Sequence, residues 1–278
     1  MLDLVQRFAS PADVARAVSV LMGVSAAVTF AEKLVRAHDF GPGGWFPWRI
    51  FRFDRLQVAT VRRLPRFFDA LFGFSGMSLM LVAGLLGVGV MWLAPISTWR
   101  FTAGVATVVA VILLLHVRST YGGDGSQQMN LLVGSALLLG FNPIVRPAAG
   151  VVSLLFIAAQ SCLAYATSGL AKVASPIWMR GDPLVGIFAT TAYGSPLGLR
   201  LVSVHSAMRR AVCLGMVFTE TIFPLAVVAP EPVLVAFLAW GVLFHLSNAV
   251  LMGLNTFFWS FLATYPALIY VWHVLHAT

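Results

Sequence analysis

Charged residues are scarce in this sequence. Asp, Glu, Lys and Arg make up only 10% of the 278 residues, whereas apolar residues make up 59%. A soluble domain carries about 25% charged residues. The mean hydropathy is +0.89, so a soluble core of this size could not bury so much apolar surface. The scarcity of charge therefore excludes a soluble protein and predicts an integral membrane protein.

Cysteine is also scarce, and several common site motifs are missing. Cys162 and Cys213 both lie inside apolar runs and form neither a CxxC motif nor a metal-ligand spacing. This pattern implies no disulfide framework, and we interpret both residues as small apolar packing groups. The sequence contains no GxGxxG, P-loop, serine elbow or HExxH motif. We therefore expect no metal site.

The few charges present are mostly positive. Lys and Arg number 18 against 10 Asp and Glu, which gives a net charge of +8, and only Lys33 and Lys172 are lysines. Most of the arginines stand between apolar runs. This placement is typical of contacts with anionic lipid head groups and of a topology signal. We expect the lipid bilayer, and not nucleic acid, to be the partner of these cations.

The apolar runs predict an all-α fold, a polytopic bundle of membrane helices. A membrane helix needs about 20 mostly apolar residues. A further stretch at 183–200, in addition to the full-length apolar runs, is interrupted by glycine and proline and is typical of an interfacial or re-entrant helix. We expect a single transmembrane domain over 1–278, no separate soluble domain, and a multi-pass location in the cell membrane. About eight runs are candidates, at 13–31, 70–94, 101–117, 129–145, 149–170, 210–229, 233–253 and 256–275.

The connection at 32–69 interleaves basic and aromatic residues. Such a pattern predicts an amphipathic helix in the head-group layer, with Pro47 near its start. We interpret it mainly as an anchor and topology determinant; binding of an anionic lipid or an acidic peptide is the alternative. The positive-inside rule places this first connection in the cytoplasm, with the third and fifth connections on the same side.

Ionisable residues inside membrane segments are costly and indicate function by default. Lys172 is either a helix-end anchor that snorkels or a buried amine, neutral in a medium of low dielectric, that acts as a general base. Glu220 should be protonated or paired with a cation, and Lys172 is one candidate partner. His245 and Asn248 share a helical face, which indicates a polar group opposite them.

The third connection, from His116 to Asn130, contains Gly122-Gly123-Asp124-Gly125. One interpretation is a tight hairpin with Ser126 as the cap of the next helix. The other is that Asp124 faces the same polar cavity as Lys172, together with Gln127 or Gln128.

Several of these segments resemble a known family. The segment around Lys172, from Tyr165 through Ser168-Gly169-Leu170-Ala171-Lys172-Val173 to Trp178-Met179-Arg180-Gly181, resembles the active-site lysine segment of vitamin K-dependent gamma-glutamyl carboxylases. Phe244-His245-Leu246-Ser247-Asn248 is similar to an F-H-x-x-N step of that family. Two further segments are similar to bacterial members of the horizontally transferred transmembrane (HTTM) domain family, which includes sporulation-delaying-toxin maturation B-type proteins. They are Tyr121–Gln128 and the stretch from Ala31-Glu32-Lys33-Leu34 to Trp48-Arg49.

The resemblance implies roles for particular residues. Lys172 would be the base that drives oxygenation of a reduced, vitamin K-like quinone, and His245 would share the catalytic site. Asn248, Trp178 and Gly181 would contact or shape the substrate pocket. Asp124, Gln127, Gln128 and Glu220 complete the expected substrate-binding set.

The resemblance has two departures. The carboxylases carry a large extramembrane domain that binds the peptide, and this sequence has none, so a soluble partner subunit would have to supply it. The carboxylase lysine faces the lumen, whereas the arginine pattern places the Lys172 loop in the cytoplasm.

Four functions therefore remain open. The first is a membrane subunit in the maturation, modification or export of a peptide. The second is a lysine-based membrane enzyme related to the carboxylases that acts on a quinone-like or peptide substrate. A transporter or lipid-binding protein is the third, and a scaffold without a site is the fourth.

Overall fold

Helices make up most of the part of the chain that the structure describes. The computed structural model describes residues 10–52, 65–119 and 124–277, and these ranges contain helices and no strand. The predicted all-α class is therefore confirmed. Seven helical segments in these ranges are long and apolar enough to cross a membrane: α2 (Pro11–Val35), α6 (Phe74–Leu93), α7 (Trp99–Arg118), α9 (Pro147–Val173), α13 with η2 (Ser206–Val227), α14 (Glu231–Met252) and α15 with α16 (Asn255–His276).

The eighth predicted span is shorter than expected. The run at 129–145 forms α8 (Gly125–Gly140), of 16 residues, about 24 Å long at 1.5 Å per residue. The hydrocarbon core of a bilayer is about 30 Å thick. The helix begins early because the Asp124 carboxylate accepts a hydrogen bond from the Gln127 N–H at 3.0 Å. Asp124, and not Ser126, is thus the cap. The run at 129–145 is present as a helix, but it is shorter than the seven segments that are long enough to cross a membrane.

The helices group into two compact units, and each is described by itself. One unit comprises Ala15–Val151, and the other comprises Val152–Thr278 with Met1–Val14. We call them the N-terminal and C-terminal units. The expected single domain over 1–278 stays a prediction.

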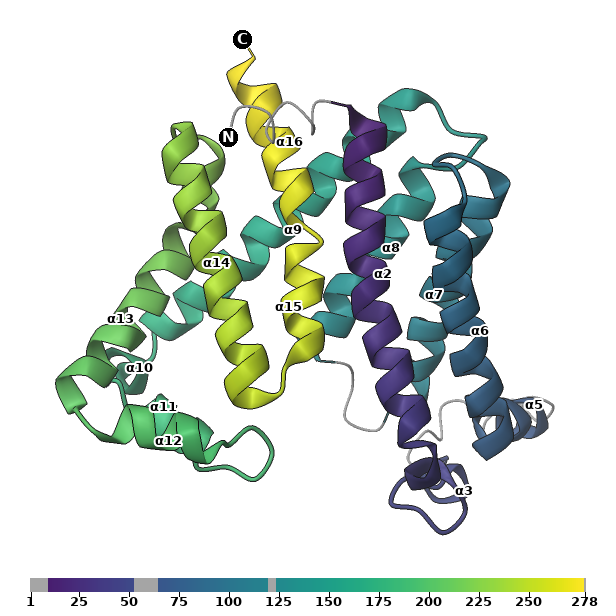
Figure 1. The fold of residues 1–278 in the computed structure, drawn as a ribbon, viewed down its shortest axis with the longest axis horizontal. Coiled ribbons are helices and arrows are strands. Elements are labelled where there is room, and N and C mark those ends of the chain that lie inside the picture. The colour runs from purple at the N-terminus through teal and green to yellow at the C-terminus, as the bar shows by residue number, and fades with distance from the viewer. Residues whose placement is uncertain (1–9, 53–64, 120–123, 278) are drawn as a thin grey trace. The chain divides into compact units, whose positions relative to one another are not determined.

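The long helices of the N-terminal unit are α2, α6, α7 and α8 (Figure 1). Glycine lets α6 and α7 approach closely, since a Cβ atom at Gly104 would lie 2.9 Å from the Gly87 carbonyl oxygen. Small residues serve this purpose in membrane bundles. Polar contacts add to the packing: Asn130 Nδ2 on α8 donates to Ser25 Oγ on α2 at 2.7 Å. Arg16 donates to the carbonyl of Met91 at 3.1 Å, near the end of α6.

Three short helices lie between α2 and α6 in sequence. They are η1 (Ala37–Phe40), α3 (Trp48–Phe51) and α5 (Pro65–Phe72). Pro47 precedes α3, as predicted for the start of a helix. Residues 53–64 of the expected amphipathic helix lie outside the described residues. Asp69 joins α5 to the α3 region, because its carboxylate accepts from Trp48 Nε1 at 2.8 Å and from Arg52 Nη1 at 2.9 Å.

The C-terminal unit contains α9, α13, α14, α15 (Asn255–Leu262) and α16 (Tyr265–His276). Pro266 separates the last two helices, because proline has no N–H to donate to the carbonyl of Leu262. Thr264, at the break, donates from Oγ1 to Ser161 Oγ on α9 at 2.9 Å. The break is therefore stabilised by a buried side-chain hydrogen bond.

Short helices also form the connection between α9 and α13. They are α10 (Pro176–Arg180), α11 (Pro183–Phe188) and α12 (Pro196–Ser203), each with proline in its first turn. The predicted interrupted element at 183–200 is thus two short helices, which lie crosswise at the end of α13 and α14 in Figure 1. Leu184 and Phe188 pack on the buried Cys213 of α13. Cys213 is a free thiol, as is Cys162.

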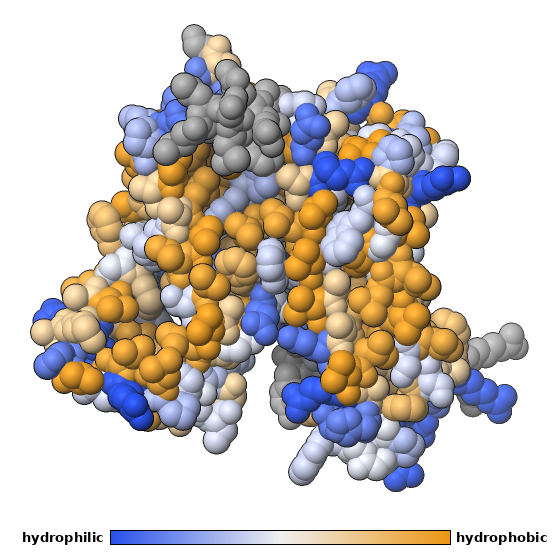
Figure 2. Space-filling view, viewed as in Figure 1, coloured by the Kyte–Doolittle hydropathy of each residue, from blue (hydrophilic) through white to orange (hydrophobic). Residues whose placement is uncertain are grey.

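The outer surface of the helices suits a lipid environment. In Figure 2, hydrophobic side chains cover the middle of α6 and of α14, and hydrophilic ones gather toward their ends. On α6, Leu79, Leu86 and Leu93 are 70%, 67% and 89% exposed, and their seven-residue spacing puts them on one helix face. A stripe of exposed leucine is expected where lipid replaces water. The chain is therefore a multi-pass membrane protein.

Candidate functional site

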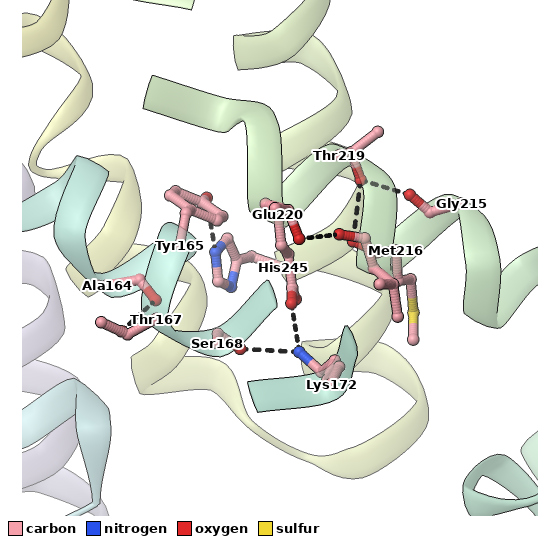
Figure 3. A network of polar contacts seen from close by, with 12 residues as sticks. Ala164, Tyr165, Thr167, Ser168, Lys172, Gly215, Met216, Thr219, Glu220 and His245 are labelled. Atoms are coloured by element: carbon pink, nitrogen blue, oxygen red, sulfur yellow. Dashed lines mark hydrogen bonds and ion pairs between the residues drawn. The ribbon is translucent and has the colours of Figure 1, made fainter. Parts of the chain in front are cut away.

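A buried ion pair joins α9 and α13 in the C-terminal unit. Lys172 Nζ contacts the Glu220 carboxylate, and the side chains of Lys172 and Glu220 are only 15% and 2% exposed. The ammonium also donates to Ser168 Oγ at 2.7 Å, and the ring centre of Trp178 lies 5.2 Å from it. Figure 3 shows Ser168, Lys172 and Glu220 converging on this point. The ammonium is thus held by an anion, a hydroxyl and an aromatic face.

Glycine allows α9 and α13 to approach closely enough for this pair. A Cβ atom at Gly169 would lie 2.7 Å from the Cα atom of Thr221, and closer still to its backbone nitrogen. Backbone atoms cannot move aside as a flexible side chain can. Gly169 therefore brings Lys172, three residues later, within reach of Glu220, one residue before Thr221.

A chain of three buried polar side chains adjoins the ion pair. The Tyr165 hydroxyl lies 2.8 Å from His245 Nε2 and 2.8 Å from the Tyr265 hydroxyl. Tyr165, His245 and Tyr265 are 3%, 4% and 5% exposed. The His245 ring also stacks on Phe261, with centroids 4.4 Å apart. His245 Nδ1 is buried and has no hydrogen-bond partner among the described residues.

The two groups share one face of α9. Tyr165, Ser168 and Lys172 are spaced by three and four residues, so their side chains follow one side of the helix. Figure 3 shows His245 between Tyr165 and the Lys172–Glu220 pair. The site thus places an amine, a carboxylate, an imidazole and two phenols in one buried region.

The structure brings together several of the residues that the sequence predicts. Lys172, Glu220, Trp178 and His245 meet in the C-terminal unit, and Lys172 pairs with Glu220, a pairing that the sequence left open. Gly181 ends α10 in the left-handed conformation, with φ of 85°. Its carbonyl accepts from Arg209 Nε at 2.9 Å, so this glycine shapes the connection.

The other predicted site residues are arranged differently. Asn248 lies one turn after His245 on α14 and is half-buried. Asp124, Gln127 and Gln128 lie at the start of α8, in the N-terminal unit. Their expected place in a cavity with Lys172 stays a prediction, while the cap formed by Asp124 accounts for that residue structurally.

Sequence reasoning did not select Tyr165, Ser168 and Tyr265 for the site. Tyr165 and Ser168 could have been selected from their spacing before Lys172, because that spacing places all three side chains on the same helix face. Tyr265 gives no such signal, because its partner Tyr165 lies 100 residues away.

No protein-family model, curated protein or solved structure matches this chain. The resemblance to the HTTM family therefore stays a prediction based on short motifs. Among the described residues, no group of three His, Cys, Asp or Glu side chains could hold a metal ion.

Proposed function

We propose that this chain is a membrane-embedded enzyme in which Lys172, paired with Glu220, removes a proton from a small substrate. The observation that carries the proposal is the buried Lys172–Glu220 pair beside the His245–Tyr165–Tyr265 chain. Ionisable side chains within membrane helices are costly and usually functional. A scaffold could lock α9 to α13 with neutral hydrogen bonds, like the one by which Thr264 joins the break between α15 and α16 to Ser161 on α9.

The pair can supply a neutral amine without separating charge. When the Lys172 ammonium passes a proton to the Glu220 carboxylate, the pair goes from two opposite charges to none. Its net charge is zero before and after the transfer. Because isolated charges are expensive in a medium of low dielectric, this route is favoured over loss of the proton from a lone lysine. The neutral amine can then accept a proton from a bound substrate.

His245 is placed to orient the substrate. One ring nitrogen is taken by the Tyr165 hydroxyl, which fixes the ring, while the other has no partner among the described residues. In a neutral imidazole one nitrogen donates and the other accepts, and Tyr165 can satisfy either tautomer. The open nitrogen can therefore bind a hydroxyl or a carbonyl group of the substrate.

A reduced quinone is the substrate class that suits these residues. Planar rings surround the polar groups: Tyr165 stacks on Phe223 at 3.8 Å between centroids, and His245 stacks on Phe261. A hydroquinone would supply an acidic phenolic proton for the amine, and it partitions into the bilayer. The resemblance of the Lys172 segment to that of the vitamin K-dependent carboxylases supports the same class.

The experiment uses the full-length protein in lipid nanodiscs without a partner. Reduced naphthoquinone and oxygen are supplied, and the oxygenated quinone product is measured by chromatography and mass spectrometry. We expect product with the wild-type protein. We expect a loss of about 100-fold or more in Lys172→Ala, because general base catalysis contributes about 10²–10⁴-fold. Thermal unfolding in detergent checks that the variant is folded.

The alternative, a membrane subunit for the maturation or export of a peptide, gives a different result. Such a subunit should co-purify with a partner and form no product alone. Absence of product from the folded wild-type protein, or equal product from Lys172→Ala, would contradict the enzyme proposal.

A further inference from the structure

Two cations, Lys33 and Arg118, lie together in the N-terminal unit, where α2 and α7 end. Lys33 is in the last turn of α2, and Arg118 is the last residue of α7. Both line a cavity of about 230 Å³, and its described lining residues include no Asp or Glu. The other described lining residues are Phe40, Phe46, Phe51, Met77, Leu115 and Ser119. The cavity thus combines two positive charges with an aromatic and aliphatic surface.

Arg118 is buried, and the partners that hold its guanidinium among the described residues are uncharged. It is 6% exposed, and its guanidinium donates to the carbonyls of Phe72 at 3.3 Å and Phe46 at 3.0 Å. The ring centre of Phe40 lies 4.8 Å from it. These contacts fix the guanidinium but bring no negative charge to it. A buried cation without an anion is strongly disfavoured, so a counter-ion is expected.

Lys33 forms no hydrogen bond or close ion pair with the described residues, although the Asp124 and Glu32 carboxylates are near enough to attract its ammonium. Three carboxylates in this region have closer partners of their own. Asp39 contacts Arg36 and His38. Asp69 is taken by Arg52 and Trp48. Asp124 caps α8 and accepts from Ser126 Oγ at 2.6 Å. A cation in the last turn of a helix also offsets the helix dipole, which explains the position of both residues but supplies no full negative charge.

We propose that this cavity binds the phosphate of an anionic membrane lipid head group. A volume of about 230 Å³ is below the 300–1,000 Å³ of pockets for drug-sized ligands. It therefore suits a head group and not a whole lipid, whose acyl chains would lie along the outside of the helices. Lys33 and Arg118 can both donate charge-assisted hydrogen bonds to phosphate oxygens. The basic residues of the first connection are typical of the head-group layer.

Native mass spectrometry of the delipidated full-length protein tests this proposal. The protein is titrated with phosphatidylglycerol, phosphatidylcholine and inorganic phosphate in separate experiments. We expect one tightly bound phosphatidylglycerol, weak binding of phosphatidylcholine, and competition by phosphate only at high concentration. Lys33→Gln should weaken phosphatidylglycerol binding about tenfold or more, as for a lost hydrogen bond to a charged group. This variant should fold, because the Lys33 amine forms no hydrogen bond with the described residues and glutamine keeps most of the side-chain length.

Arg36→Gln is the matched control, because Arg36 is one turn away, its side chain is 76% exposed, and it pairs with Asp39. It should change binding less than twofold. Arg118→Lys keeps the charge but loses the planar donor group, and we expect it to weaken binding as well. Lys172→Ala should bind lipid normally, so this proposal is independent of the proposed enzyme site.

Equal loss of phosphatidylglycerol binding in Lys33→Gln and Arg36→Gln, or equal binding of both lipids by the wild-type protein, would overturn the proposal. Inorganic phosphate bound as tightly as phosphatidylglycerol would overturn the lipid assignment.

Discussion

At the scale of residues, the function of a polar side chain in this protein follows from what faces it. Lys172 and Glu220 neutralise each other between two membrane helices. Tyr165 connects His245 to Tyr265 and has both contacts buried. Asp124 instead accepts a hydrogen bond from the Gln127 N–H at the start of α8. Similar side chains thus serve a site in one case and a helix end in another.

Removal of the Tyr165 hydroxyl should destabilise the protein more than removal of the Tyr265 hydroxyl. Tyr165→Phe leaves both His245 Nε2 and the Tyr265 hydroxyl without their buried partner. Each unsatisfied buried group costs about 1–3 kcal/mol. Tyr265→Phe leaves the contact between Tyr165 and His245 intact. Thermal unfolding in detergent should therefore give the lower Tm for Tyr165→Phe, and equal Tm values would contradict the buried chain.

Part of the site could be predicted because charge is rare in this sequence. Lys172, Glu220 and His245 stand out within apolar runs. A buried carboxylate that keeps its charge needs a cation beside it, because burial of an unpaired charge has a high free-energy cost. Tyr265 does not stand out, because tyrosine is ordinary in a membrane helix and its contact depends on tertiary packing. The assignment of Asp124 to the N-terminal unit and of Lys172 to the C-terminal unit likewise has no local signal.

At the scale of elements, close helix contacts and helix ends position the site. Gly169 brings α9 against the backbone of α13 at Thr221. Asp124 starts α8, and the Asn142-Pro143 step follows its end. Helix type was predictable from the long apolar runs, but the length of α8 depends on a cap two residues earlier than expected.

Gly169→Ala should separate α9 from α13. The added methyl group would overlap the Thr221 backbone, so we expect a loss of about 1–3 kcal/mol, as for overpacking in a core, together with reduced turnover. Gly215→Ala is the control on α13, because a Cβ atom there has no neighbour within 4 Å. Alanine is favoured over glycine within a helix, so Gly215→Ala should be neutral or stabilising. Equal stability of the two variants, measured by thermal unfolding, would contradict the close contact.

Asp124→Ala should cost about 0.5–2 kcal/mol, the usual effect of losing an N-cap. Asp124→Asn should retain most of this stability, because asparagine caps helices about as well as aspartate. Thermal unfolding compares the two variants, and a product assay separates the cap from a role in the cavity. Loss of turnover in a stable Asp124→Asn protein would indicate that the carboxylate also serves the site.

At the scale of the whole molecule, the number of membrane crossings decides the topology. Composition and the apolar runs together predicted a polytopic membrane bundle, and seven long apolar helices in the described residues confirm it. The shorter α8 determines whether the first and fifth connections lie on the same side. A helix shorter than the bilayer core can still cross it by local thinning, so we expect eight crossings.

Cysteine labelling tests this topology. After Cys162 and Cys213 are replaced by alanine, one variant carries cysteine at Gly43 and another at Ser206, both of which are exposed. If α8 crosses the membrane, a membrane-impermeant maleimide should label both from the same side, the cytoplasm by the positive-inside rule. Labelling from opposite sides would show that α8 does not cross.

The most direct test of the base assigned to Lys172 is the turnover of Lys172→Arg under the product assay described above. Arginine keeps the positive charge and can still pair with Glu220, but its guanidinium stays protonated in proteins. If Lys172 is the base, the variant should remain folded and lose about 100-fold or more of its turnover. Turnover equal to that of the wild-type protein would show that position 172 needs only a positive charge, and Lys172 would then be an anchor.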